Sequence, residues 1–116
     1  MKIGIQGSRN FHDYTIFLRA MGTALSALGD DDESIVFFTA GPYKVNSMVM
    51  EFANVSERGL KARGKSVQVV KVSPKWLKSK MGEMNHFVYL SLPKEPLSEL
   101  VREAEDKDIF VGVYRY

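Results

Sequence analysis

Three residues near the start of the chain, Gly7, Ser8 and Arg9, are of the types that hold a phosphate or another anion. They follow a short apolar run and precede an amphipathic segment, the order expected for a strand, a tight turn and a helix. Backbone N–H groups at the start of a helix carry partial positive charge, and the Arg9 guanidinium adds a fixed cation with planar donors. We therefore predict that these residues, with Asn10, form an anion site at the carboxyl end of the first strand. The alternative is an ordinary turn in which Ser8 or Asn10 caps the helix and Arg9 lies in solvent.

The loop after the second apolar run is the other candidate for anion binding. Thr39 ends that run, Gly41 permits a close turn of the backbone, and Lys44 can reach an anion at the turn. Because the carboxyl ends of parallel strands meet at one edge of a sheet, we expect Gly7 and Gly41 to contribute to a single anion site. Asn46 follows at the start of the next predicted helix, where capping that helix is its preferred role.

Other sets of side chains lack the spacing of a catalytic or metal centre. Ser8, His12 and Asp13 are close in sequence, but the start of a helix does not bring them into a triad, and no Gly-x-Ser-x-Gly elbow is present. The chain has no cysteine, and His12 and His86 do not have the spacing of zinc ligands, so we expect no disulfide and no metal. Asp30–Asp32 are predicted to form an exposed turn on the far side of the sheet from the anion site.

Five short runs rich in Val, Ile, Phe and Tyr predict the strands that position these loops. The runs are Lys2–Gln6, Ile35–Thr39, Ser66–Val72, Phe87–Leu92 and Ile109–Tyr114. They are nearly continuous apolar runs, and such runs are typical of parallel strands that helices cover on both faces.

Amphipathic segments between the strands predict helices over about Tyr14–Leu28 and Asn46–Arg63, and from a cap at Ser98 to about Asp106. A short helix or turn is predicted after the third strand, where Trp76 is expected to anchor the connection near the carboxyl edge of the sheet. The alternation of strands and helices predicts a single α/β domain over residues 1–116. Its expected architecture is three-layer and Rossmann-like, with about five mostly parallel strands.

Composition and charge exclude several classes of function. The chain has 116 residues, of which 45% are hydrophobic and 26% charged, as in a soluble globular domain. Its 16 Lys and Arg residues and 14 Asp and Glu residues leave a net charge of +2, so bulk charge does not favour nucleic-acid binding. The basic stretch from Arg58 to Lys80 is interpreted as a solvated face. No apolar run is long enough to span a membrane and no signal peptide precedes the first strand, so we expect a cytoplasmic protein without a membrane partner.

Four short motifs occur in a fixed order along the chain. They are the Gly-Ser-Arg turn at Gly7–Arg9, the loop Gly41–Asn46, the Pro-x-Trp segment Pro74–Trp76 and the element Gly82–Asn85. In this order they resemble the SLOG superfamily, Rossmann-like domains related to the nucleotide-binding DprA/Smf and LOG proteins, and within it the small YspA-type family. The resemblance covers most of the chain. It implies binding of a nucleotide or nucleotide-derived ligand at the carboxyl edge of the sheet, and it adds Asn85 to the ligand-binding residues.

The chain departs from the family pattern in the loops that hold anions. Tyr43 and Asn46 stand where the family has Arg and Asp, and Met84 replaces the Arg of an Arg-Asn pair. The segment Pro93–Ser98 replaces a glycine-rich phosphate loop, and within it Glu95 is expected to repel anions. The resemblance therefore implies ligand binding with weak or no catalysis, and it leaves open whether the chain is an enzyme.

Two other functions remain open. A protein-interaction module on a degenerate SLOG fold, such as a phage protein that modulates its host, would explain the rebuilt loop and a set of methionine and aromatic side chains. The set is Met48, Met50, Met81, Met84, Tyr114 and Tyr116, and we expect at least half of the methionines to pack in the core. The third function is the nucleoside-monophosphate glycosidase activity of the LOG branch. The expected partners are a nucleotide-like small molecule, a second copy of the chain or a host protein, and no cofactor is predicted.

Overall fold

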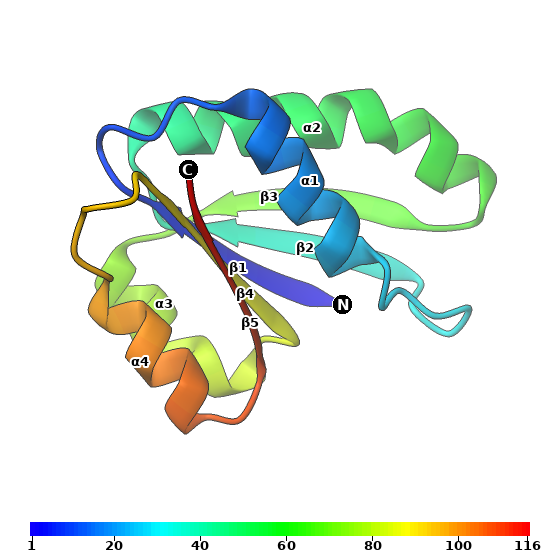
Figure 1. Cartoon of the computed structure of the whole chain (residues 1–116). Coiled ribbons are helices and arrows are strands. Elements are labelled where there is room, and N and C mark those ends of the chain that lie inside the picture. The colour runs from blue at the N-terminus through cyan, green and yellow to red at the C-terminus, as the bar shows by residue number, and fades with distance from the viewer.

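Five parallel strands form one sheet in the order β3-β2-β1-β4-β5 in the computed structural model, which describes all 116 residues (Figure 1). The strands are β1 (Lys2–Gly7), β2 (Ser34–Thr39), β3 (Ser66–Lys71), β4 (His86–Ser91) and β5 (Phe110–Arg115). The chain runs outward from β1 to β3 and then crosses to the other side of β1 for β4 and β5. This reversal places a topological switch point between the carboxyl ends of β1 and β4, where open α/β sheets bind ligands.

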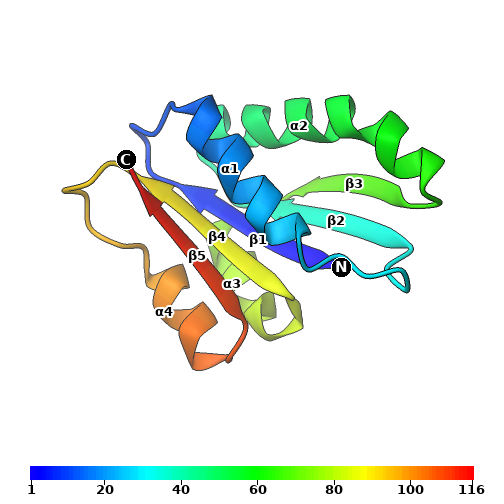
Figure 2. The ribbon, with the colours of Figure 1, turned by 45° about the vertical axis from the view of Figure 1, so that its right-hand side comes forward.

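Helices cover both faces of the sheet, so the predicted three-layer Rossmann-like α/β arrangement is confirmed. The helices are α1 (Tyr14–Leu25), α2 (Tyr43–Ala62), α3 (Pro74–Lys80) and α4 (Glu99–Asp106), and a 3-10 turn, η1 (Met81–Glu83), follows α3. Figures 1 and 2 show α1 and α2 on one face of the sheet and α3 and α4 on the other. None of these helices has the length and apolarity that crossing a membrane requires.

The core consists of two layers, one on each face of the sheet. On the α1 and α2 face, Ile3 and Ile5 of β1 are fully buried, and Phe52 of α2 makes edge contacts with Phe17 and Phe37 at centroid distances of 6.1 and 6.0 Å. On the other face the apolar side chains of α3 and α4 pack against β4. Of the methionines considered above, Met48, Met81 and Met84 are buried, and Met50 is 46% exposed.

The first helix begins at Tyr14 as predicted but ends at Leu25 rather than at Leu28, and the second helix starts earlier than predicted. The cap of α1 is Asp13, whose carboxylate accepts the N–H of Ile16 at 3.1 Å, so neither Ser8 nor Asn10 caps this helix. The second helix begins at Tyr43 rather than at the predicted Asn46, which lies inside its first turn. The start of α2 was misplaced because Asn46 is a residue type that caps helices well wherever it stands.

Trp76 packs on the sheet near its carboxyl edge. Its ring stacks on Phe38 of β2, with centroids 5.2 Å apart and ring planes 28° apart, and the hydroxyl of Ser73 accepts its backbone N–H at 3.0 Å. Trp76 therefore anchors the connection into α3 as predicted. It remains 37% exposed, because only one side of the ring is covered.

Candidate functional site

The carboxyl end of β1 is tied by backbone hydrogen bonds to the loop after β2 and to strand β4. The N–H of Gly7 donates to Gly41 O at 3.0 Å, and the N–H of Ser8 donates to Leu90 O at 2.8 Å. A Cβ atom built on Gly7 would lie only 2.5 Å from Cγ2 of Val45 in α2. The loop thus enters the switch point through a position that only glycine can occupy without displacing α2.

The carboxylate of Glu95 occupies the switch point and is held from both sides. Its Oε1 accepts the hydroxyl of Ser8 at 2.5 Å and the backbone N–H of Leu92 at 2.8 Å, and its Oε2 accepts the Asn10 amide at 3.1 Å. The Arg115 guanidinium donates to the backbone oxygen of Glu95. We call Ser8, Asn10 and Leu92 the carboxylate cradle, because they supply the three donors that surround this oxyanion.

The cradle changes the chemistry of Glu95. The hydrogen bond from Ser8 holds the pKa of Glu95 below its ordinary value, and the backbone N–H of Leu92 adds to this effect. Partial burial acts in the opposite direction, and the Asn10 amide and the Arg115 charge lower the pKa further. The sequence suggested that Glu95 would repel anions from this edge. The structure shows Glu95 itself as the anion that the loop donors hold.

Replacing Glu95 with glutamine is expected to change how stability depends on pH. The folded-state pKa lies below the unfolded value of about 4.5, so the contribution of the carboxylate is complete above that pH and is lost as the pH falls through the folded-state pKa. The difference in free energy of unfolding between wild type and Glu95→Gln should therefore shrink below about pH 4.5. Denaturant unfolding at a series of pH values measures it, with the exposed Glu57→Gln as control. A difference of constant size from neutral pH to about pH 3 would contradict the assignment.

The second predicted loop is braced internally. The side-chain oxygen of Asn46 accepts the hydroxyl of Thr39 at 2.6 Å and the N–H of Gly41 at 2.9 Å. Gly41 has a φ of +89°, a left-handed conformation that favours glycine. Thr39 and Asn46 therefore hold the loop in shape through the Thr39 hydroxyl and the Asn46 side-chain oxygen. Asn46 does not cap α2 as predicted, because Pro42 stands at the cap position.

The backbone N–H groups at the start of α2 nevertheless have no side-chain partner. No side chain caps it and its first turn holds no acidic residue. Lys44 in that turn is exposed, as is Arg9 in the neighbouring loop, and neither makes an ion pair. Two free cations and an uncapped helix start thus lie on the loops that flank the carboxyl end of β1.

The position of Asn85 contradicts its prediction as a ligand-binding residue. Its side-chain oxygen accepts the N–H of Lys2 at 2.7 Å, and its own N–H donates to Lys2 O at 2.8 Å. Lys2 begins β1 and Asn85 directly precedes β4, so both lie at the amino edge of the sheet, opposite the switch point. The prediction that Asn85 joins the carboxyl-edge site is therefore wrong. Its position before a strand, rather than after one, was the signal in the sequence.

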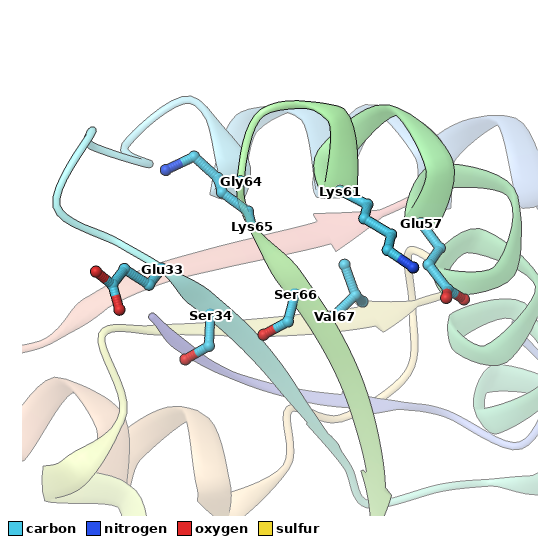
Figure 3. Close-up of a pocket in the computed structure, with 8 residues that line it drawn as sticks. All are labelled: Glu33, Ser34, Glu57, Lys61, Gly64, Lys65, Ser66 and Val67. Carbon is cyan, nitrogen blue, oxygen red and sulfur yellow. The ribbon is translucent and has the colours of Figure 1, made fainter.

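The open depressions of the surface lie away from the switch point. The largest has a volume of about 670 Å³ at the amino ends of β2 and β3 and the end of α2 (Figure 3). It is lined by Glu33, Ser34, Glu57, Lys61, Gly64, Lys65, Ser66 and Val67. Figure 3 shows the Lys65 side chain pointing away from Ser66 and Val67 toward the loop before β2. The two smaller depressions, of about 480 and 520 Å³, lie along α2.

The Lys65 side chain, which lines this depression, holds the neighbouring acidic turn in place. The residue is only 5% exposed, and its Nζ donates to Gly29 O at 2.8 Å and to Asp32 O at 2.7 Å. The Asp32 carboxylate in turn accepts the N–H of Gly29 at 2.8 Å, and this bond is the main reason that the pKa of Asp32 is lowered. The acidic turn is thus exposed and remote from the switch point, as predicted, and Lys65 fastens it to β3.

Comparisons with family models, with curated proteins and with solved structures give no match to this chain. No three His, Cys, Asp or Glu side chains converge in a way that could hold a metal ion. The candidate functional site therefore consists of the carboxylate cradle, Arg9 and the uncapped start of α2.

Proposed function

We propose that this protein binds a nucleotide or nucleotide-derived ligand at the carboxyl edge of the sheet, with weak or no turnover. The carboxylate cradle carries the proposal. Its three donors come from the loops after β1 and β4 and converge on one oxyanion at the switch point. Phosphate is an oxyanion with the same demand for N–H and O–H donors. Displacement of the Glu95 side chain would make these donors available to a phosphate group.

The charges around the cradle favour an anionic ligand. Arg9 and Lys44 are exposed and make no ion pair, so a phosphate would not have to break an existing one. The uncapped start of α2 adds partial positive charge beside the loop of Gly7. These groups give the site its preference for nucleotides over neutral nucleosides.

The same geometry argues against efficient catalysis. A nucleophilic Ser8 would need a strong base, but its hydroxyl donates to a carboxylate whose pKa is lowered. A lowered pKa also keeps Glu95 ionised near neutral pH, so it is a poor general acid. His12 is exposed, and its Nδ1 lies 3.0 Å from Asn10 O, outside the cradle.

Removal of the Glu95 carboxylate is expected to tighten anion binding. Glu95→Ala frees the three donors of the cradle and removes a competing negative charge. The affinity for inorganic phosphate and for adenosine monophosphate should rise by about 10-fold. Isothermal titration calorimetry measures it, with Glu57→Ala, a remote exposed carboxylate, as the matched control. Unchanged affinity in Glu95→Ala would show that the cradle is not the binding site.

Removal of the Arg9 guanidinium is expected to weaken binding. Arg9→Ala should reduce the binding free energy of a nucleotide by ~1.5 kcal/mol, the lower end for a charge-assisted hydrogen bond because Arg9 is exposed. Arg58→Ala, which removes an exposed charge from the far part of α2, is the control. A panel of nucleotides in calorimetry gives the comparison, and mass spectrometry of the purified protein would identify a retained nucleotide. Equal loss in both variants would mean that only overall charge matters.

One observation favours the alternative of a protein-interaction module. Three large apolar side chains are exposed along β5 and the residue after it, namely Phe110, Val113 and Tyr116. They lie on or directly after the edge strand, where an apolar protein surface, rather than a nucleotide, would cover them.

A further inference from the structure

The edge strand β5 exposes large apolar side chains and carries a single charged residue, Arg115, at its end. Phe110 is 72% exposed, Val113 39% and Tyr116 55%, and no charged residue or proline lies between Phe110 and Tyr114. Natural edge strands commonly carry lysine, proline or a bulge that prevents pairing with another chain. The other edge strand, β3, also ends in an exposed cation, Lys71, but it exposes Gln68 and has no exposed large apolar side chain. The two edges of this sheet are therefore not equivalent.

The free backbone groups of β5 can be assigned from its register. Ser91 of β4 pairs with Arg115, and the N–H of Tyr116 donates to Ser91 O at 3.0 Å. Since the groups of a strand alternate in direction, the even-numbered residues of β5 point toward β4. The N–H and C=O groups of Val111, Val113 and Arg115 point away from the sheet. None of the hydrogen bonds of the chain reaches them.

We propose that two copies of this chain pair through β5 as antiparallel strands, with the two-fold axis at Val113. In this register Val113 of one copy faces Val113 of the other, and Val111 faces Arg115. These are the outward-pointing residues, so they form the hydrogen-bonded pairs of an antiparallel ladder. All free N–H and C=O groups of the strand are then satisfied, and the two sheets become one continuous sheet.

The side chains of β5 fit the same register. Phe110 lies opposite Tyr116 of the other copy, and Gly112 lies opposite Tyr114. These even-numbered residues form the non-hydrogen-bonded pairs, in which facing side chains are closest. The Tyr114 ring of the same chain lies over Gly112, since a Cβ built on Gly112 would meet its Cε2 at 2.9 Å, so the Tyr114 ring of the other copy packs against this ring. The pairing therefore covers the two most exposed aromatic rings of the strand on one face and Val113 on the other.

Neighbouring registers fit less well. An axis at Gly112 would place two glycines opposite each other and would leave Tyr116 beyond the paired segment. An axis at Tyr114 would place the two Tyr114 rings opposite each other and Gly112 opposite Tyr116, so Phe110, which is 72% exposed, would not face Tyr116. Only the axis at Val113 covers both Phe110 and Tyr116.

Proline substitutions on the two edge strands test the proposal. Val113→Pro removes an outward N–H that the single chain does not use, and proline is tolerated on edge strands at such positions. Lys71→Pro is the matched control, since the register of β3 with β2 points the N–H of Lys71 outward from the opposite edge. Sedimentation velocity over a range of concentrations should show a dimer for wild type and for Lys71→Pro. For Val113→Pro the dissociation constant should rise by at least about 10-fold.

Circular dichroism would show whether Val113→Pro is folded. If it is not, a second variant tests the dimer interface. Phe110→Lys changes a side chain that is 72% exposed and places like charges near the interface, so it should also yield a folded monomer. The double variant Phe110→Cys/Tyr116→Cys provides a check of register, because these positions face each other in a non-hydrogen-bonded pair, the chain has no other cysteine, and disulfides should form between the copies under mild oxidation. A wild-type chain that is monomeric at millimolar concentration would overturn the proposal. So would folded Val113→Pro or Phe110→Lys variants that dimerise as tightly as wild type.

Discussion

Replacing Lys65 with methionine is expected to lower the free energy of unfolding by about 3 kcal/mol. The Lys65 ammonium donates to the carbonyl oxygens of Gly29 and Asp32, and the residue is 5% exposed. Methionine keeps the aliphatic length of the side chain but has no donor. The substitution would therefore remove the ammonium from both carbonyl oxygens, of which Gly29 O keeps only the N–H of Asp32 at 3.1 Å, and it would release the acidic turn from the start of β3.

The control for this prediction lies on the same part of the surface. Lys61→Met removes the same charge from an exposed position near the end of α2, so its effect should be within about 0.5 kcal/mol of wild type. Urea unfolding followed by circular dichroism measures both variants. Similar effects in Lys65→Met and Lys61→Met would show that charge alone, and not the two hydrogen bonds, accounts for the loss.

Replacing Gly7 with alanine is expected to destabilise the fold by about 2–3 kcal/mol. The added Cβ would lie 2.5 Å from Cγ2 of Val45 and 3.3 Å from the Leu90 carbonyl oxygen. Val45 is fully buried, so neither it nor the backbone of β4 can move aside freely. The cost arises from crowding at the junction of β1 with α2.

A second substitution distinguishes crowding from other causes. Val45→Ala removes the methyl group that meets the new Cβ, so the double variant should lose less stability than the sum of the two single losses. Gly22→Ala is the matched control, because a Cβ at Gly22 meets nothing within 4 Å and alanine is the better helix former. It should be neutral or slightly stabilising. Strict additivity in the Gly7 and Val45 pair would contradict the explanation.

The fold could be predicted because it depends on local patterns. The apolar run that contains Ile35 and Phe37 is almost unbroken, as burial on both faces requires, and β2 formed within one residue of its predicted start. The cap of α4 was likewise visible, since Ser98 accepts the N–H of Leu100 at 3.1 Å. Such features need only the neighbouring residues to be recognised.

The candidate site could be predicted only in part. The loop of Ser8 was found from its composition, but Ser8 and Glu95 are 87 positions apart and no local pattern relates them. Their contact follows from the insertion of β4 beside β1, which the sequence does not specify. The sequence identified two of the three donors of the carboxylate cradle, Ser8 and Asn10, whereas Leu92 and the carboxylate of Glu95 join them only through the order of the strands.

The central place of β1 also determines when its partners reach it during synthesis. β1, β2 and β3 are consecutive in the chain and pair on one side of β1 as they emerge. The other side of β1 pairs with β4, which begins only at His86. During translation, the half-sheet β3-β2-β1 therefore exposes the unpaired edge of an apolar strand until β4 has left the ribosome. In that interval the edge of β1 is open to pairing with another chain.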